Sequence, residues 1–363
     1  MISHSDGTRN CCGRNARARG LHSFGSTCSG FSLPELLVSM AVLLVVAGAV
    51  ISMISYNEKN YGRTVQQSDM YENVRAVAEL MAQEIGQAGL VDLPTSATPT
   101  LSTAVTKSAT AQTVAVSSTT SMYAGEVLLV DTATNEEPVT ITSLTSTSIT
   151  GIFANNHPTA GAVIHAIGVA PNGIVAPSSS ATTPGGVSCV TIPTGVTYTA
   201  TDGSTCNVLN IWGDLNSDGT LLYVRYTCNL PTTPGPTTTP GTLTRSVTTI
   251  TPGVNTVSTA QTLLSTLIQN PPSSAPNPCF QYDLSTQQLV VNGVVTNTYY
   301  MVANVGLTIS VQTLRPDPIT RQYLTMTKSF LDLSPRNILA GYEQANWGDA
   351  SRLQNPPPNL TLY

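Results

Sequence analysis

The 363-residue chain is short of charge, since Asp, Glu, Lys and Arg together make up only 10% of it, against about 25% in an ordinary soluble domain. Its 15 basic residues are outnumbered by 20 acidic ones and form no stripe. Non-specific nucleic-acid binding needs several basic side chains on phosphates, so no nucleic-acid partner is expected. Long coiled coils and charge-rich disordered tails are excluded too, because both are rich in charge.

Catalytic motifs are missing as well. The sequence contains no G-x-S-x-G, H-E-x-x-H or G-x-x-x-x-G-K, which would indicate hydrolase, metalloprotease or phosphate-binding chemistry. Beyond residue 30 the only histidines are His157 and His165, and His165 alternates with apolar residues as a strand residue does. The acidic pair Glu136-Glu137 precedes a proline and is interpreted as a solvated turn. We expect a protein that is not an enzyme.

The few charges are unevenly placed. Residues 1–30 hold four arginines, whereas the run from Leu36 to Ile54 holds no charged residue. As a helix, these roughly 19 residues would extend about 28 Å, close to the roughly 30 Å hydrocarbon core of a bilayer. The run is therefore expected to span a membrane. The arginines place residues 1–30 in the cytoplasm and the chain after Ile54 on the far side.

The junction before this run reads Gly30-Phe31-Ser32-Leu33-Pro34-Glu35. A glycine, an aromatic residue and a carboxylate five positions after the glycine, all directly before an apolar span, resemble the type IV prepilin motif. The resemblance implies that prepilin peptidase removes residues 1–30 as a leader, cutting after Gly30, and methylates the new N-terminus at Phe31. Unlike the apolar part of a secretory signal, this apolar segment is kept after cleavage.

Two explanations account for Glu35. With Ser32 it forms an S-x-x-E capping box, in which Ser32 caps the helix and the Glu35 side chain bonds the backbone N–H of Ser32. Capping leaves unexplained why a costly carboxylate stands at the edge of a bilayer. The pilin resemblance supplies a partner, because Glu35 would pair with the amine of Phe31 on a neighbouring subunit during assembly.

The apolar helix is expected to continue beyond the membrane. A stripe of apolar residues recurs at steps of three and four from residue 70 to residue 85, with charged residues between its members; the stripe comprises Met70, Val74, Val77, Met81 and Ile85. Gly86, Gly89 and Pro94 supply stop signals. The sequence thus predicts one spine helix over 31–92, with 31–55 in the membrane or filament core and the rest packed on a globular head.

The remainder of the chain is expected to form β-structure. Residues 93–107 resemble a linker, 108–170 a small inserted β-module, and 171–363 a β-rich head. The predicted fold class is α+β, pilin-like, with a long N-terminal helix packed on an antiparallel sheet. Strands are expected in both β regions, at 126–131, 138–143, 147–153 and 162–168, then at 206–212, 220–228, 241–250, 287–295, 299–313 and 322–331.

Short segments of the head resemble minor pilins of the PilW type and the related pseudopilins of type II secretion: Leu222–Tyr226, Leu243–Arg245, Val302–Val305 and Pro335–Asn337. The resemblance implies a minor pilin that acts in pilus assembly, initiation or adhesion. The alternatives are a type II secretion pseudopilin and an adhesin with its binding site on the 108–170 module. The implied partners are prepilin peptidase, other pilin subunits, the inner-membrane assembly platform and, before assembly, membrane lipid. The implied location is the bacterial inner membrane with the head in the periplasm, then the pilus or cell surface.

Four cysteines remain after residue 30, an even number that fits disulfides in an oxidising compartment. They are Cys189, Cys206, Cys228 and Cys279. Three connectivities are possible, and the shorter loops favour Cys189–Cys206 with Cys228–Cys279.

One further motif concerns calcium. Asp214, Asn216 and Asp218 precede Gly219 in the pattern D-x-[DN]-x-[DN]-G of a calcium loop. The position that supplies a bidentate Glu in an EF-hand is Arg225, and the flanking segments are predicted strands rather than helices. Because Asn, Asp, Ser and Gly also form turns for reasons of their own, a polar hairpin turn and a Ca²⁺ site both remain open. No other cofactor is indicated.

Overall fold

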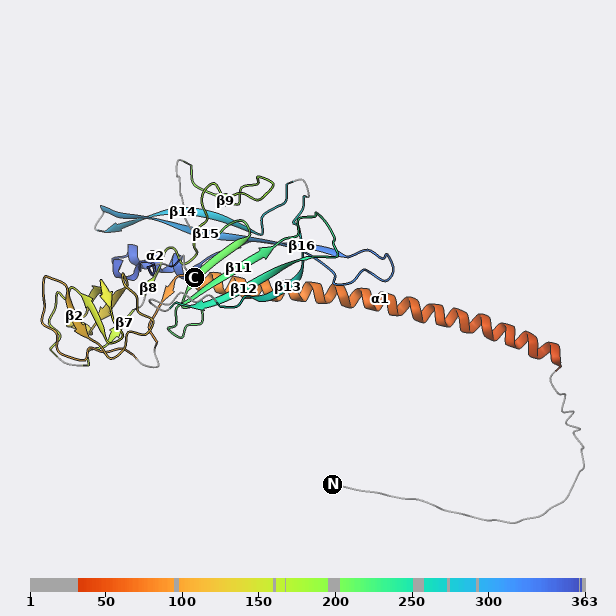
Figure 1. Cartoon of the computed structure of the whole chain (residues 1–363), viewed down its shortest axis with the longest axis horizontal. Helices are drawn as coiled ribbons and strands as arrows, with labels where there is room; N and C mark the ends of the chain where they lie inside the picture. The colour runs from red at the N-terminus through yellow and green to blue at the C-terminus, as the bar shows by residue number, and fades with distance from the viewer. Residues whose placement is uncertain are drawn as a thin grey trace, which may run out of the picture. The chain divides into compact units, whose positions relative to one another are not determined.

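The computed structural model (Figure 1) describes residues 32–94, 98–158, 161–166, 168–194, 203–250, 258–272, 275–291, 294–358 and 360. Gly30 and Phe31 lie outside the described residues. The chain divides into two compact units, Met1–Glu58 and Lys59–Tyr363.

Helix α1 (Leu33–Gln87) is 55 residues long, so the predicted long N-terminal helix is confirmed. In the first unit its large apolar side chains are exposed from Leu33 to Ile54. In the second unit one face of the helix is buried, and this face carries the whole stripe predicted from the sequence between Met70 and Ile85. The same helix therefore changes from an uncovered apolar rod to the core helix of a head.

A glycine just beyond the helix ends it. Gly89 has φ +75°, a left-handed conformation that favours glycine. Its N–H donates to the carbonyl of Trp212 at 2.8 Å. A Cβ here would lie 2.5 Å from the carbonyl oxygen of Ala170, so the chain can turn closely against the head only because residue 89 has no side chain.

The head contains an eight-stranded sheet in the order β10-β11-β12-β13-β15-β14-β9, with β16 paired to β15. Its strands are antiparallel apart from the β14–β9 pair. The buried stripe of α1 shares one hydrophobic core with this sheet. The strands are β9 (Val190–Thr191), β10 (Val208–Gly213), β11 (Leu222–Asn229), β12 (Gly241–Thr249), β13 (Gln261–Ile268), β14 (Phe280–Val291), β15 (Val294–Gln312) and β16 (Thr325–Leu333).

The head differs from the prediction in two respects. The segment 287–295 was predicted as one strand, but β14 ends at Val291 and β15 begins at Val294. Strand β13 and helix α2 (Arg336–Asn346) were not predicted from the sequence. Helix α2 packs on β14 through a hydrogen bond from the Tyr342 hydroxyl to the carbonyl of Gln288. A short 3-10 helix η3 (Ala350–Arg352) follows α2.

The inserted module forms two three-stranded sheets of its own, ordered β2-β6-β5 and β4-β3-β7. None of these six strands pairs with the head sheet in the described residues. The two-stranded pair of β1 with β8 lies beside it. The elements are β1 (Leu90–Val91), β2 (Gln112–Ala115), β3 (Val127–Val130), 3-10 helix η2 (Ala133–Asn135), β4 (Glu137–Thr140), β5 (Ser143–Leu144), β6 (Ser148–Gly151), β7 (Ile164–His165) and β8 (Gly168–Val169).

The predicted linker needs correction. Leu101 and Val105 are buried in the core of the module and form bridges to Val116 and His157. The module therefore begins near residue 99 rather than at 108. The Ser- and Thr-rich composition of this stretch concealed two apolar residues that reach the core.

A second hydrophobic core joins the module to one end of the head. It contains module residues such as Leu128, Ile149 and Phe153 together with Trp212 and Tyr223 of the head sheet. The module thus adds its own sheets, and its core is continuous with one end of the head.

The chain segment Leu353–Asn355, here called the strap, is hydrogen-bonded to the module. The side-chain amide of Gln354 accepts from Val127 N–H at 2.8 Å and donates to Val127 C=O at 2.9 Å. Asn355 donates to the carbonyl of Gly125 at 3.0 Å and accepts from the Tyr123 hydroxyl at 2.7 Å. The backbone of Gln354 also donates to Val169, so the strap holds β3 and β8 at once.

Candidate functional site

Glu35 lies in the first turn of α1, where the chain enters the apolar run. Its Oε2 accepts hydrogen bonds from both the backbone N–H and the hydroxyl of Ser32, each at 3.0 Å. The bond that Glu35 was predicted to return to the Ser32 backbone N–H is present, while the Ser32 hydroxyl donates to the Glu35 carboxylate. Both bonds use Oε2, and Glu35 is exposed, so capping leaves the carboxylate open to a second partner.

The surface that follows Glu35 is a row of uncovered apolar side chains. Over the described residues one helix, α1, is long and apolar enough to cross a membrane, and none of its most apolar 18-residue window is buried. Large exposed side chains on this part of α1 include Leu36, Leu43, Val45, Ile51 and Met53. An exposed apolar rod of this kind needs lipid or other apolar helices around it.

A buried ionic network joins α1 to the head sheet. Glu84 of α1 is 6% exposed and accepts hydrogen bonds from the Tyr226 hydroxyl of β11 and the Arg245 guanidinium of β12. Burial and the Glu84 charge raise the pKa of Tyr226 far above its usual value. Burial alone would lower the pKa of Arg245, but the Glu84 carboxylate raises it. Both partners therefore keep their protons, and the helix is held to two strands by one carboxylate.

Sequence reasoning missed this network, although a signal was present. Glu84 stands seven residues after Val77 and three after Met81, a spacing that puts it on the buried stripe rather than between its members. A carboxylate on a buried face needs a partner, and partners for buried charges come from other elements.

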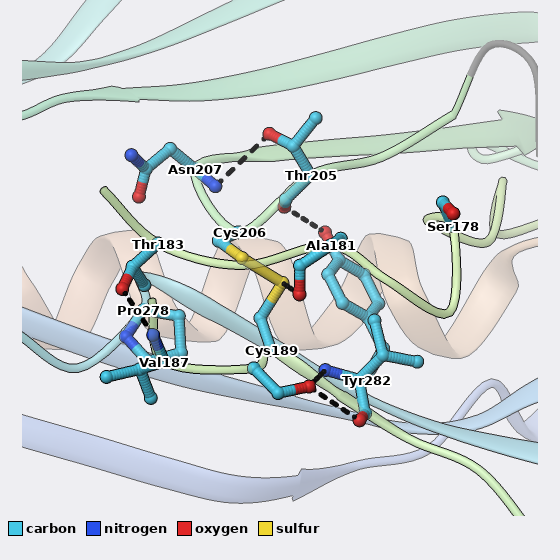
Figure 2. Close-up of a disulfide and its surroundings, with 12 residues drawn as sticks. Ser178, Ala181, Thr183, Val187, Cys189, Thr205, Cys206, Asn207, Pro278 and Tyr282 are labelled. Atoms are coloured by element: carbon cyan, nitrogen blue, oxygen red, sulfur yellow. Dashed lines mark hydrogen bonds between the residues drawn. A yellow bond between two sulfur atoms is a disulfide. The ribbon is translucent and has the colours of Figure 1, made fainter. Parts of the chain in front are cut away.

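A disulfide joins Cys189 to Cys206, with their Cα atoms 5.4 Å apart. Figure 2 shows Tyr282 of β14 beside it, with its backbone N–H donating to the carbonyl of Cys189 at 2.8 Å. The Tyr282 hydroxyl reaches the carbonyls of Thr205 and Val208. The first of the two predicted bridges is thus present, and it connects the segment that leads into β9 with the start of β10.

The second predicted bridge is not formed. Cys228 and Cys279 are free thiols buried in the head core, where burial and the hydrogen-bonded Cys279 thiol raise the pKa of Cys228. Loop length ranks connectivities by chain entropy, but it does not determine whether two neighbouring sulfur atoms bond. The two thiols nevertheless lie in contact, as the predicted pairing implied.

The Asp214–Gly219 segment closes as a polar turn. The two carboxylate oxygens of Asp214 accept from the N–H groups of Asp218, at 3.1 Å, and Gly219, at 2.9 Å, while Asn216 donates to Asp218 at 2.7 Å. Burial raises the pKa of Asp214, and the charges of Asp218 and Asp92 add to the effect. Nowhere in the described residues are three His, Cys, Asp or Glu side chains grouped to hold a metal ion. Calcium binding stays a prediction.

Comparison with known proteins identifies only the N-terminus. The family described as "Prokaryotic N-terminal methylation motif" matches residues 25–51, a range that includes Gly30, Phe31, Glu35 and the start of α1. No curated protein and no solved structure matches the chain. The motif and the apolar helix together support a type IV pilin-like or pseudopilin-like protein, and they imply processing by prepilin peptidase and assembly with other pilins.

Proposed function

We propose that the protein is a minor pilin of a type IV pilus, processed between Gly30 and Phe31 and assembled through α1. The observation that carries the proposal is the division of α1 into two parts. Its first part is an exposed apolar surface that begins at Glu35 inside the matched motif. Its second part is buried in the core of a β-rich head.

This division suits a subunit that changes surroundings. In the bacterial inner membrane, lipid would cover the apolar part of α1, and the head would face the periplasm. In a filament, the apolar parts of neighbouring subunits would replace the lipid. Glu35 would then pair with the Phe31 amine of a neighbour, which removes the cost of leaving a carboxylate in an apolar surrounding.

Two other functions would use the same assembly route. A pseudopilin of type II secretion would share the motif and the helix, and the protein would then act in a periplasmic pseudopilus. An adhesin would bind its target through the inserted module, which forms two sheets beyond the head sheet. Recovery of the protein from sheared surface pili separates the pilus from the pseudopilus.

The assembly mechanism is tested by Glu35→Ala. We expect the variant to be cleaved and methylated normally but to be at least tenfold depleted from sheared filaments. Ser32→Ala removes the hydroxyl donor to Glu35 and keeps the carboxylate, so it should assemble. Glu72→Ala, on the exposed face of the same helix, is a matched control for loss of a helical glutamate. Wild-type levels of Glu35→Ala in filaments would contradict the proposal.

A further inference from the structure

A fully buried histidine lies between two carboxylates in the inserted module. His157 is 0% exposed; its Nδ1 lies 2.9 Å from Asp131 Oδ2 and its Nε2 lies 2.8 Å from Glu137 Oε1. Asp131 directly follows β3, and Glu137 begins β4. The acidic pair predicted as a solvated turn is therefore half buried, because Glu137 points to His157 rather than to solvent.

The two carboxylates fix the protonation of the ring. An ionised carboxylate only accepts hydrogen bonds, and a neutral imidazole has one N–H to donate. With both carboxylates ionised, both short contacts are hydrogen bonds only when the ring is an imidazolium, which donates from both nitrogens. His157 in turn lowers the pKa of Asp131 by hydrogen bonding to it.

The loop between the two carboxylates is strained. Asp131 has φ +72° and Ala133 has φ +55°, in the left-handed region that costs non-glycine residues on the order of 1–3 kcal/mol each. The loop contains the short helix η2 and is otherwise exposed. Within the loop, Asp131 Oδ1 accepts from the Thr132 N–H at 2.9 Å, and Asp131 Oδ2 links the loop to the buried His157 ring.

The backbone is hydrogen-bonded on both sides of this contact, since the Asp131 N–H donates to the carbonyl of Val163 at 2.8 Å, but the Asp131 carboxylate is the more exposed of the two. The backbone of His157 exchanges two 2.8 Å hydrogen bonds with Val105. Glu137 is also held by the N–H groups of Ala154, at 2.6 Å, and Asn155, at 3.1 Å. The side chain of Asp131 is 19% exposed, against 6% for Glu137. Loss of one of the two ring contacts would therefore free the Asp131 side first.

We propose that His157 is a proton-dependent latch, which holds the strained loop 131–136 closed while its ring is doubly protonated and releases Asp131 when the ring loses a proton. This device goes beyond assembly, because it would let the pH of the surroundings change the surface of the module. It needs no ligand or partner.

Other groups around the ring do not replace either carboxylate. Phe153 presents its edge to the ring at a centroid distance of 6.0 Å. Among the neighbouring charged residues, Lys107 contacts Asn156 through its backbone and has an exposed side chain, and Glu136 is exposed in the loop itself. Burial raises the pKa of Glu126 in the same core to about 8, so Glu126 must be controlled for in any pH experiment.

The sign of the pH effect follows from linkage. In the open state the ring has lost Asp131 as a partner, so it holds its second proton less tightly than in the closed state. At pH values where the open ring has lost this proton and the closed ring has not, opening is accompanied by proton release, and the opening constant rises by up to about tenfold per pH unit. Acidic conditions close the loop, and alkaline conditions open it.

Amide hydrogen exchange of the full chain in detergent tests the latch, with rates in peptides covering 131–136 corrected for intrinsic exchange. In a Glu126→Gln background, opening should increase by about 10- to 100-fold from pH 7 to pH 9. Adding Asp131→Asn should reduce this rise to less than about threefold, because an amide can either accept from or donate to Nδ1. His165→Gln, at the half-exposed histidine of β7, should keep the full rise.

A second variant keeps the test decisive if Asp131→Asn does not fold. Ala133→Gly relieves the left-handed strain, so it should lower opening at pH 9 by about fivefold and leave the pH dependence intact. Equal pH dependence with Asp131 and with Asn at this position would overturn the latch. So would a rise that His165→Gln abolishes, or an Ala133→Gly loop that opens as readily as the wild type.

Discussion

Each of the two hydrophobic cores buries a glutamate, and the two side chains are satisfied in different ways. Glu84, in the core shared by α1 and the head sheet, has Arg245 and Tyr226 as partners from two strands. Glu126, in the core shared by the module and the head, is fully buried, and its Oε2 accepts from the backbone N–H of Tyr123 at 3.0 Å; among the described residues its Oε1 has no partner. One site stabilises a carboxylate ion, and the other favours a neutral carboxylic acid.

This difference separates the roles of the two cores. The head core must hold the helix that carries the assembly surface, and an ion pair between helix and sheet fixes the register of the two. The module core contains groups whose charge depends on pH: burial raises the pKa of Glu126 to about 8, and His157 lies between two carboxylates. We therefore expect the head to be insensitive to moderate pH changes and the module to respond to them.

The largest effect is expected for Arg245→Met, which leaves the Glu84 carboxylate buried without its cation. Removal of one partner from a buried pair costs about 3–5 kcal/mol of stability, so the melting temperature of the head should fall strongly. The double variant Glu84→Leu, Arg245→Met should recover most of the loss, because it removes both charges. Arg75→Met breaks the exposed Arg75–Glu79 pair on the same helix and should leave unfolding unchanged. Equal behaviour of Arg245→Met and Arg75→Met would refute the ionic link.

Glu126→Gln should produce the next largest effect, and only at neutral to alkaline pH. The pKa of Glu126 is raised from 4.5 to about 8 by burial, so the unfolded chain binds fewer protons than the folded chain between these values. Stability of the wild-type module therefore falls as pH rises through this window, by on the order of 3 kcal/mol between pH 5 and pH 8. Glutamine keeps the acceptor for Tyr123 and cannot ionise.

The measurement is the melting temperature of the wild type and of Glu126→Gln at pH 5 and pH 8. The two proteins should melt alike at pH 5, and the variant should melt higher at pH 8. Glu136→Gln changes an exposed neighbouring glutamate and should show the wild-type pH dependence. If the variant is no more stable than the wild type at pH 8, ionisation of Glu126 does not destabilise the folded protein.

These buried charges show where sequence reasoning succeeds and where it fails. The helix and its stripe were predictable because apolar residues repeat with the helical period over many turns. Strand β13 was not, since its Thr, Ser and Gln residues resemble the hydroxyl-rich loops around it. Helix α2 contains Gly341, a poor helix former, which is needed because a Cβ there would lie 2.0 Å from the Val169 side chain.

The candidate site divides in the same way. Gly30, Phe31 and Glu35 are contiguous, so a local motif reveals them, and the Ser32–Glu35 cap follows from their spacing. The partners of Glu84 and His157 come from residues far away in the chain, and polarity alone suggested that Glu137 faces solvent. Long-range pairing decides which charged residues are buried, and one sequence does not contain that information.

A smaller effect is expected for Gln354→Ala, which cuts the strap between the two regions. The variant removes both hydrogen bonds to the Val127 backbone, at an expected cost of about 1–2 kcal/mol. Because these bonds hold β3, faster hydrogen exchange should appear in the module and not in β11 or β12. Gln344→Ala, on the exposed face of α2, should change neither. Uniform loss of protection across the head would mean that module and head unfold as one unit.

The smallest effect concerns Asp214, a buried carboxylate that is satisfied in a different way from Glu84 and Glu126. Two backbone N–H groups of its own turn donate to its two oxygens, although burial raises its pKa. The turn therefore closes without a metal, and Ca²⁺ can add only the energy of a weak site. With a dissociation constant near 1 mM, as in extracellular modules, 5 mM Ca²⁺ would stabilise the fold by about 1 kcal/mol. We expect a rise of a few degrees in melting temperature with Ca²⁺ and none with Mg²⁺, and its loss in Asp218→Ala. If Ca²⁺ leaves the wild type unchanged, backbone N–H groups alone are enough to bury this carboxylate, and the contrast with Glu84 becomes sharper.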